Sequence, residues 1–146
     1  MPNRVTPFLM FEGCADDAIE LYASVFEDVA VLSHERYGAD DGGAEGTVKM
    51  AVFRLRGQRL IAIDSPTSHD FSFTPSFSLF VDCEDGEELG LIFERLSADG
   101  EVLMPVDDYG FGLFGWLNDR FGVSWQLSVG GVVVEGDAPS EAEMEA

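Results

Sequence analysis

Hydrophobic and polar positions in the first part of the chain follow first a strand period and then a helix period. Val5 to Phe11 is a short apolar run typical of a buried strand, and Glu12-Gly13 ends it. From Ala15 to Phe26 apolar residues recur at helical spacing. Asp16 and Asp17 stand in the first turn, where the helix dipole favours negative charge. The pattern therefore predicts a strand followed by an amphipathic helix.

Three β-rich runs complete the first half. They are Val29 to Tyr37, Thr47 to Leu55 and Gln58 to Asp64. An acidic, glycine-rich loop from Gly38 to Gly46 separates the first two, and Arg56-Gly57 predicts a tight turn between the last two. The predicted order is β-α-β-β-β.

The second half repeats this order. Ser76 to Val81 alternates as a strand, and a helix with an apolar stripe of Leu89, Ile92, Phe93 and Leu96 follows it. Further strands are predicted at 101–105, 113–118 and 123–129, with a glycine-rich loop from Asp107 to Gly112. We expect one domain, 1–131, built of modules 4–66 and 74–129 with a linker at 65–75, and an acidic tail, 132–146, that frays.

The turns predict which residues face each other. A two-residue turn at Arg56-Gly57 places Leu55 opposite Gln58, Phe53 opposite Leu60, Ala51 opposite Ala62 and Lys49 opposite Asp64. The last pair is either a charged anchor for a ligand or an ion pair at the sheet rim. A four-residue turn at 119–122 sets Trp116 opposite Trp125 as an aromatic core pair.

Alternation along two strands of the second module separates an apolar face from a polar one. Phe77, Leu79 and Val81 are predicted to point to the core, and Ser76, Ser78 and Phe80 away from it. In 123–129 the outward set is Ser124, Gln126 and Ser128. These side chains would face either bulk water or a cleft shared by the two modules.

Composition narrows the class of partner. The 146 residues are 46% hydrophobic and 25% charged, as in ordinary globular proteins, but 28 acidic against 8 basic residues give a net charge of −20. Such a surface repels nucleic acid and anionic membranes. With no signal peptide, no apolar run long enough to span a membrane, and only two cysteines, Cys14 and Cys83, we expect a cytoplasmic protein.

The sequence contains few residues in the spacing of known catalytic motifs. His34 and His69 are 35 residues apart, so no helical two-histidine metal motif exists; His69 is either oriented by Asp70 or structural in its loop. The chain has no Gly-x-Ser-x-Gly, P-loop or Gly-x-Gly-x-x-Gly sequence, and no cofactor is expected. Asp16 and Asp17 oppose activation of Cys14 by the helix dipole, which predicts an inert thiol.

Several motifs resemble a known family. They are Pro7-Phe8-Leu9-Met10-Phe11-Glu12-Gly13, Ala18-Ile19-Glu20-Leu21-Tyr22, Glu35-Arg36-Tyr37-Gly38, Ile63-Asp64-Ser65-Pro66 and the long stretch from Phe114 to Leu127. Together with the repeated order they resemble the PhnB-like branch of the vicinal oxygen chelate superfamily. The resemblance implies an α+β class, the glyoxalase/bleomycin-resistance/dioxygenase fold, with two βαβββ modules forming a curved mixed-sheet cleft, and a homodimer. This branch often carries the label 3-demethylubiquinone-9 3-methyltransferase, which no glycine loop for S-adenosylmethionine supports here.

The resemblance also implies a place for a metal. Enzymes of the superfamily hold a divalent ion through His, Gln or Glu at strand positions that fall here near Thr6 or Pro7, at Ala62, at Ser76 and at Gln126. Only Gln126 is a ligand type that the superfamily uses. A catalytic metal normally needs about three protein donors, so we expect no metal.

The leading hypothesis is therefore a metal-free protein that binds a small organic molecule in its cleft, with a role in resistance or in metabolite binding; whether it is an enzyme stays open. The expected ligand-binding residues are Lys49, Phe53, Asp64, Ser76, Ser78, Phe80, Ser124 and Gln126. The alternative is a metal-dependent lyase, isomerase or dioxygenase with ligands among Glu12, Asp64, His69 and Gln126. A third possibility is a dimerisation or regulatory protein.

Overall fold

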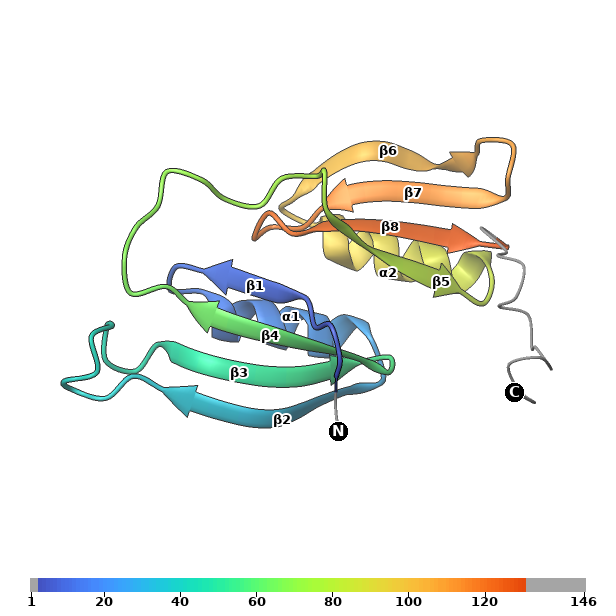
Figure 1. The fold of residues 1–146 in the computed structure, drawn as a ribbon. Helices are drawn as coiled ribbons and strands as arrows, with labels where there is room; N and C mark the ends of the chain where they lie inside the picture. The colour runs from blue at the N-terminus through green and yellow to red at the C-terminus, as the bar shows by residue number, and fades with distance from the viewer. Residues whose placement is uncertain (1–2, 131–146) are drawn as a thin grey trace. The chain divides into compact units, whose positions relative to one another are not determined.

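The chain forms two compact units, each a four-stranded sheet with one helix (Figure 1). The computed structural model describes residues 3–130, so the predicted tail 132–146 lies outside the described residues. The units are Met1–Ser72 and Phe73–Ala146, and their boundary falls within segment 65–75. No helix between residues 3 and 130 is both long and apolar enough to cross a membrane.

The first unit has the predicted βαβββ order. Its elements are β1 (Phe8–Phe11), α1 (Ala15–Val25), β2 (Val29–Arg36), β3 (Val48–Leu55) and β4 (Gln58–Asp64). The sheet order is β1-β4-β3-β2, with β1 parallel to β4 and the other pairs antiparallel. The first strand starts at Phe8, three residues later than predicted.

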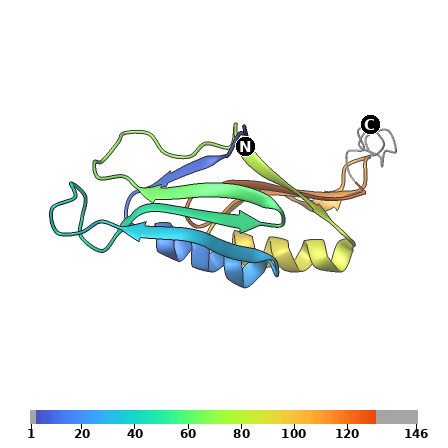
Figure 2. The same cartoon turned by 60° about the horizontal axis from the view of Figure 1, so that its bottom comes forward.

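One face of this sheet is covered by α1, which lies on one side of the strands in Figure 2. Ala15, Ala18, Ile19 and Tyr22 of α1 are buried, as are the alternate strand residues Phe53 and Leu60. Removing this apolar surface from water holds the helix on the sheet. The other strand residues, such as Val52 and Ile61, point to the helix-free face.

The β3–β4 turn has the predicted register. Arg56 and Gly57 both have positive φ angles, 51° and 83°, as a two-residue hairpin turn requires. The pairs Leu55–Gln58, Phe53–Leu60 and Ala51–Ala62 are confirmed.

The predicted pair of Lys49 with Asp64 is wrong. The strand β2 pairs Glu35 with Met50 and then Arg36 with Val48, so Lys49 is an extra residue that breaks the alternation. The Lys49 Nζ lies 4.0 Å from Asp41 Oδ2 instead.

The second unit repeats the βαβββ order. Its elements are β5 (Ser78–Cys83), α2 (Gly86–Ser97), β6 (Glu101–Asp108), β7 (Leu113–Asn118) and β8 (Ser124–Val129). The sheet order is β5-β8-β7-β6, with β5 parallel to β8. The strand β6 runs past Pro105 into Asp107 and Asp108, which the sequence assigned to a loop.

The start of β5 differs from the prediction by two residues. The N–H of Phe77 donates to the carbonyl of Thr74 (3.3 Å), and the hydroxyls of Thr74 and Ser76 lie 2.7 Å apart. These bonds form a turn before the strand, so Ser76 is not in the sheet. The predicted core residue Phe77 is 62% exposed.

The helix α2 is capped at its start. The carboxylate of Asp85 accepts the N–H of Glu88 (2.9 Å), and the Glu88 carboxylate accepts the N–H of Glu84 (2.7 Å). The predicted stripe of Leu89, Ile92, Phe93 and Leu96 is buried against the sheet. Gly115 of β7 leaves room for the Phe93 ring, because a Cβ there would lie 2.6 Å from a ring carbon.

The predicted opposition of Trp116 and Trp125 is wrong by one residue. Trp116 pairs with Gln126, and Leu117 with Trp125, because the β7–β8 loop has five residues, 119–123. The buried carboxylate of Asp119 shapes this loop by accepting the N–H groups of Phe121 (2.8 Å) and Val123 (3.1 Å), and it accepts the indole N–H of Trp125 (3.0 Å). The two tryptophans therefore point to opposite faces of the sheet.

Candidate functional site

The second sheet has a polar face on the side away from α2. Leu79, Val81, Leu117, Trp125 and Leu127 point toward the helix side, so their neighbours in the strands point the other way. The neighbours that form this surface, called the polar face, are Ser78, Phe80, Asp82, Phe114, Trp116, Asn118, Ser124, Gln126 and Ser128. They come from the three adjacent strands β5, β8 and β7.

Two side-chain hydrogen bonds order the middle of the polar face. The amide Nε2 of Gln126 donates to the Ser78 hydroxyl at 2.8 Å, across the parallel β5–β8 pair. The indole N–H of Trp116 donates to the Ser124 hydroxyl at 2.9 Å. Both bonds fix large side chains in one orientation, which preorganises the surface.

Two buried oxygen atoms on this face lack a partner. Within residues 3–130, neither Ser128 Oγ nor Asn118 Oδ1 has a hydrogen-bond partner. A buried polar atom left unpaired costs about 1–3 kcal/mol, which a ligand that donates a hydrogen bond would recover. Close by in the register, Phe80 is 46% exposed and lies opposite Gln126, so it offers an apolar surface beside the polar groups.

All charged side chains on the four strands of this unit are acidic. The strands contain Asp82, Glu101, Asp107 and Asp108 but no Lys, Arg or His. The face therefore suits neutral or cationic molecules and disfavours anions.

The structure brings together part of the predicted ligand set. Ser78, Phe80, Ser124 and Gln126 share the polar face, as the alternation predicts. Ser76 does not belong to it, because it is held in the turn before β5.

The predicted ligand residues of the first unit lie elsewhere. Phe53 is fully buried on the side of the sheet that α1 covers, which corrects its predicted place as an exposed wall. Asp64 is 3% exposed and accepts three backbone N–H groups, from Gly13 (2.8 Å), Ala15 (3.0 Å) and Val48 (2.9 Å). Its two oxygen atoms are used within the fold, so Asp64 is not a ligand anchor.

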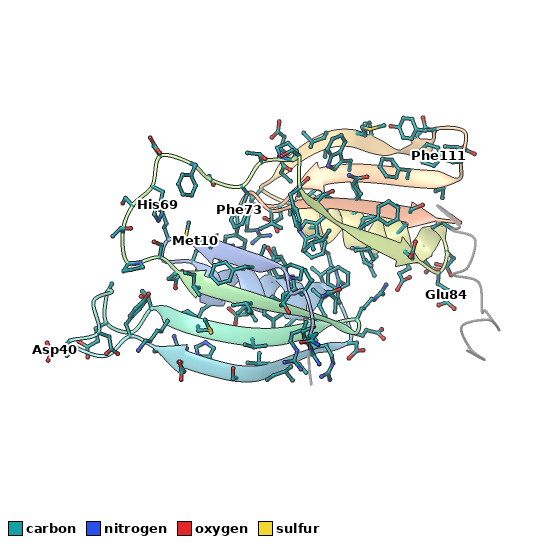
Figure 3. All side chains as sticks on the ribbon, viewed as in Figure 1. Met10, Asp40, His69, Phe73, Glu84 and Phe111 are labelled. Atoms are coloured by element: carbon teal, nitrogen blue, oxygen red, sulfur yellow. The ribbon has the colours of Figure 1, made fainter. Side chains whose placement is uncertain are left out.

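His69, labelled in Figure 3, lies in the segment after β4 and is held by neighbouring groups of the first unit. The Ser65 hydroxyl donates to the Thr67 carbonyl (2.9 Å), accepts the Thr67 N–H (3.2 Å) and lies 2.9 Å from His69 Nε2. The Ser65 hydroxyl is thus surrounded by groups of its own loop, which fixes the positions of Ser65 and His69 relative to each other. The backbone N–H of His69 donates to the Glu12 carboxylate (3.2 Å), and the imidazole ring stacks on the Phe71 ring.

The thiol of Cys14 is also placed unfavourably for chemistry. Burial, followed by the charge of Asp64, raises the pKa of Cys14 above its usual value. A raised pKa keeps the sulfur in its unreactive thiol form.

The residues at the superfamily's metal positions do not form a donor set. Ala62 is buried and has no donor, and Ser76 lies in a turn, so Gln126 is left as a single amide ligand. In the part of the chain from residue 3 to residue 130, no three His, Cys, Asp or Glu side chains lie close enough together to hold a metal ion. The alternative metal ligands predicted from the sequence, Glu12, Asp64, His69 and Gln126, also form no donor set, because Asp64 and His69 are held by other partners.

Sequence reasoning missed Trp116 and Asn118 as parts of the polar face. It placed Trp116 in the core because it assumed a four-residue turn after Asn118. The acceptor of the turn, Asp119, was visible in the sequence as a residue that commonly binds the backbone two residues on. A turn built around Asp119 allows a five-residue loop, 119–123, and this loop places Trp116 on the polar face.

Comparisons with known proteins agree with this architecture. The family model described as 3-demethylubiquinone-9 3-methyltransferase matches residues 3–128. The PhnB protein structure from Bacillus cereus is 48% identical, with a TM-score of 0.84, and the match covers 87% of this chain and 99% of that one. No curated protein matches the sequence.

More distant structures share the fold alone. A glyoxylase/bleomycin resistance protein/dioxygenase domain from Frankia is 15% identical with a TM-score of 0.62, covering 93% of this chain and 97% of that chain. The fosfomycin resistance protein FosX from Listeria monocytogenes, solved with Mn(II), is 13% identical with a TM-score of 0.60, covering 91% and 94%. The chain is thus an α+β protein of the glyoxalase/bleomycin-resistance fold, and it belongs to the PhnB-like 3-demethylubiquinone-9 3-methyltransferase family.

Proposed function

We propose that the protein binds a small, neutral or cationic organic molecule on the polar face of the second sheet, without a protein-bound divalent metal. The observation that carries this proposal is the pair of buried, unpartnered oxygen atoms, Ser128 Oγ and Asn118 Oδ1, on the same face as the ordered Gln126 and Trp116. The face combines hydrogen-bond acceptors with aromatic surface, the usual chemistry of a small-molecule site.

The ligand would contact groups of three kinds. Its hydrogen-bond donors would pair with the unpartnered oxygens, its apolar part would pack on Phe80 and Trp116, and the carboxylates of the strands would favour a positive charge. The proposal includes the predicted homodimer and cytoplasmic location. It does not include methyl transfer, since the sequence has no glycine loop of the nucleotide-binding type.

A thermal-shift screen with neutral and cationic aromatic amides and amines tests the proposal. A molecule that binds the folded form raises its melting temperature. We expect at least one such compound to bind the wild type and to lose roughly tenfold in affinity in Gln126→Leu, which removes the ordered amide. Gln58→Leu, at an exposed position of the first unit, is the matched control and should bind as the wild type does.

The same sample distinguishes the alternative. Protein purified without chelator should contain no stoichiometric Zn, Ni, Fe or Mn. If a metal is present and ligand binding disappears when the metal is removed, the hypothesis of a metal-dependent enzyme is correct. If no compound shifts the melting temperature, the polar face is not a binding site.

A further inference from the structure

The helix-free face of the first sheet carries two arginines directly opposite each other. Arg54 of β3 pairs with Arg59 of β4, and both are half-buried. Phe53, Leu55 and Leu60 are buried on the side of α1, so Arg54 and Arg59 point away from the helix. Side chains directly opposite in an antiparallel pair have Cβ atoms about 5 Å apart, which brings the two guanidinium groups within reach of one ligand.

Among the described residues, 3–130, neither guanidinium has a carboxylate partner. His34 and Arg36 pair with Asp16, Lys49 pairs with Asp41, and no ion pair between described residues involves Arg54 or Arg59. Like charges opposite each other in a sheet destabilise it. In a chain with 28 acidic residues, two adjacent unpaired arginines are an arrangement that folding alone does not favour.

Positive charge is concentrated at this hairpin. Arg54, Arg56 and Arg59 are three of the eight basic residues of the chain and lie within six positions. Arg56 does not join the pair, because its guanidinium lies over the Phe26 ring, 5.5 Å from the centroid. Glu27 and Asp28 precede β2 near the turn, and the Asp28 carbonyl accepts the N–H of Arg56.

Apolar surface continues from the arginines along the same face. The next residues in the register on this side are Val52 and Ile61, and Phe8 of β1 lies opposite Ile61. Phe8 is 51% exposed. The face therefore joins two positive groups to an apolar floor, called the arginine face.

We infer that the arginine face binds a small organic anion: a carboxylate or phosphate lies between Arg54 and Arg59, and an apolar body packs on Phe8, Val52 and Ile61. Guanidinium groups bind both kinds of oxyanion through paired N–H donors. Nucleic acids and anionic membranes are disfavoured as partners by the net charge of −20. This site lies on a different sheet from the polar face and takes a ligand of the opposite charge, so it is independent of the proposed function.

Calorimetric titration with phenyl phosphate, benzoate and the neutral benzyl alcohol tests the inference. We expect one or both anions to bind with a stoichiometry of about one, and benzyl alcohol to bind at least roughly tenfold more weakly, as loss of a charge-assisted hydrogen bond predicts. Whichever of phenyl phosphate and benzoate binds more tightly shows whether the site prefers a phosphate or a carboxylate. Binding of all three probes with equal affinity, or of none, would overturn the inference.

Substitutions of single arginines test whether the anion binds at the arginine face. Arg54→Gln and Arg59→Gln should each weaken anion binding by roughly tenfold. Arg120→Gln makes the same change of charge at an exposed position of the second unit and should bind as the wild type does. Equal loss in Arg120→Gln would mean that the anion responds only to net charge, which contradicts a built site.

Two further readouts separate binding from stability. Each Gln variant removes a repulsion between like charges, so its melting temperature without ligand should equal or exceed that of Arg120→Gln. If a Gln variant does not fold, Arg54→Lys keeps the charge and should still weaken binding, because lysine lacks the paired donors. Amide NMR shifts should fall on Phe8, Val52 and Ile61; shifts confined to Gln126 and Ser78 would assign the anion to the polar face and overturn the inference.

Discussion

The carboxylate of Asp64, the last residue of β4, binds two other segments of backbone. Gly13 and Ala15 belong to the turn that starts α1, whereas Val48 starts β3. A charged acceptor bound by three N–H groups is a strong interaction in a buried site. At the scale of single residues, Asp64 therefore holds the first unit together.

Asp64→Asn should lower the free energy of unfolding by about 1–3 kcal/mol, because an amide group turned toward an N–H leaves that donor unpaired. Urea unfolding followed by circular dichroism measures the change. Asp70→Asn, at an exposed site, is the control and should stay within about 0.5 kcal/mol of the wild type. An equal stability of the two variants would contradict the role given to Asp64.

Single residues were the hardest level to predict from the sequence. Alternation placed Ser78, Ser124 and Gln126 on one face correctly, because each lies inside a regular strand. It failed for Lys49 and Trp116, because one extra residue, in a bulge or in a loop, moves every later side chain to the other face.

At the scale of elements, the packing of α2 on its sheet depends on a missing side chain. The Phe93 ring occupies the space above Gly115, and a Cβ at this position would also lie 3.1 Å from a methyl carbon of Val106. Most element bounds followed from apolar periodicity, because each helix and sheet buries one face. The start of β5 did not, since hydrogen bonds of Thr74 and Ser76 form a turn where the apolar pattern continues.

Gly115→Ala should lower stability by roughly 1–3 kcal/mol, because the added methyl group overpacks the contact with Phe93. Gly90→Ala should change the stability in the opposite direction. Gly90 is exposed in α2 with open space around it, so alanine should raise stability by about 0.4–1 kcal/mol. Thermal unfolding of both variants measures the two changes, and a loss of stability in Gly90→Ala as large as that in Gly115→Ala would contradict the role given to the contact between Gly115 and Phe93.

At the scale of the whole molecule, charge is large in total and unequal in distribution. The net charge is −20, yet the strands of the first sheet contain four of the eight basic residues and those of the second sheet contain none. Composition predicted the total and its effect on partners. It could not predict the separation, which depends on which strands share a sheet.

The melting temperature should rise as NaCl is raised from about 0.05 to about 0.5 M, because salt screens repulsion between the acidic side chains. Differential scanning calorimetry measures the shift, and sucrose at equal osmolality controls for solute effects that do not depend on charge. A melting temperature that stays constant or falls with NaCl would show that the acidic surface does not weaken the folded state.

The opposite placement of the two tryptophans also provides built-in optical probes. Trp125 is buried and bonded to Asp119, whereas Trp116 lies half-buried on the polar face. Emission from Trp125 in a Trp116→Phe protein would report unfolding alone. In a Trp125→Phe protein, quenching of Trp116 would report occupancy of the surface beside Ser124, without any label attached to the chain.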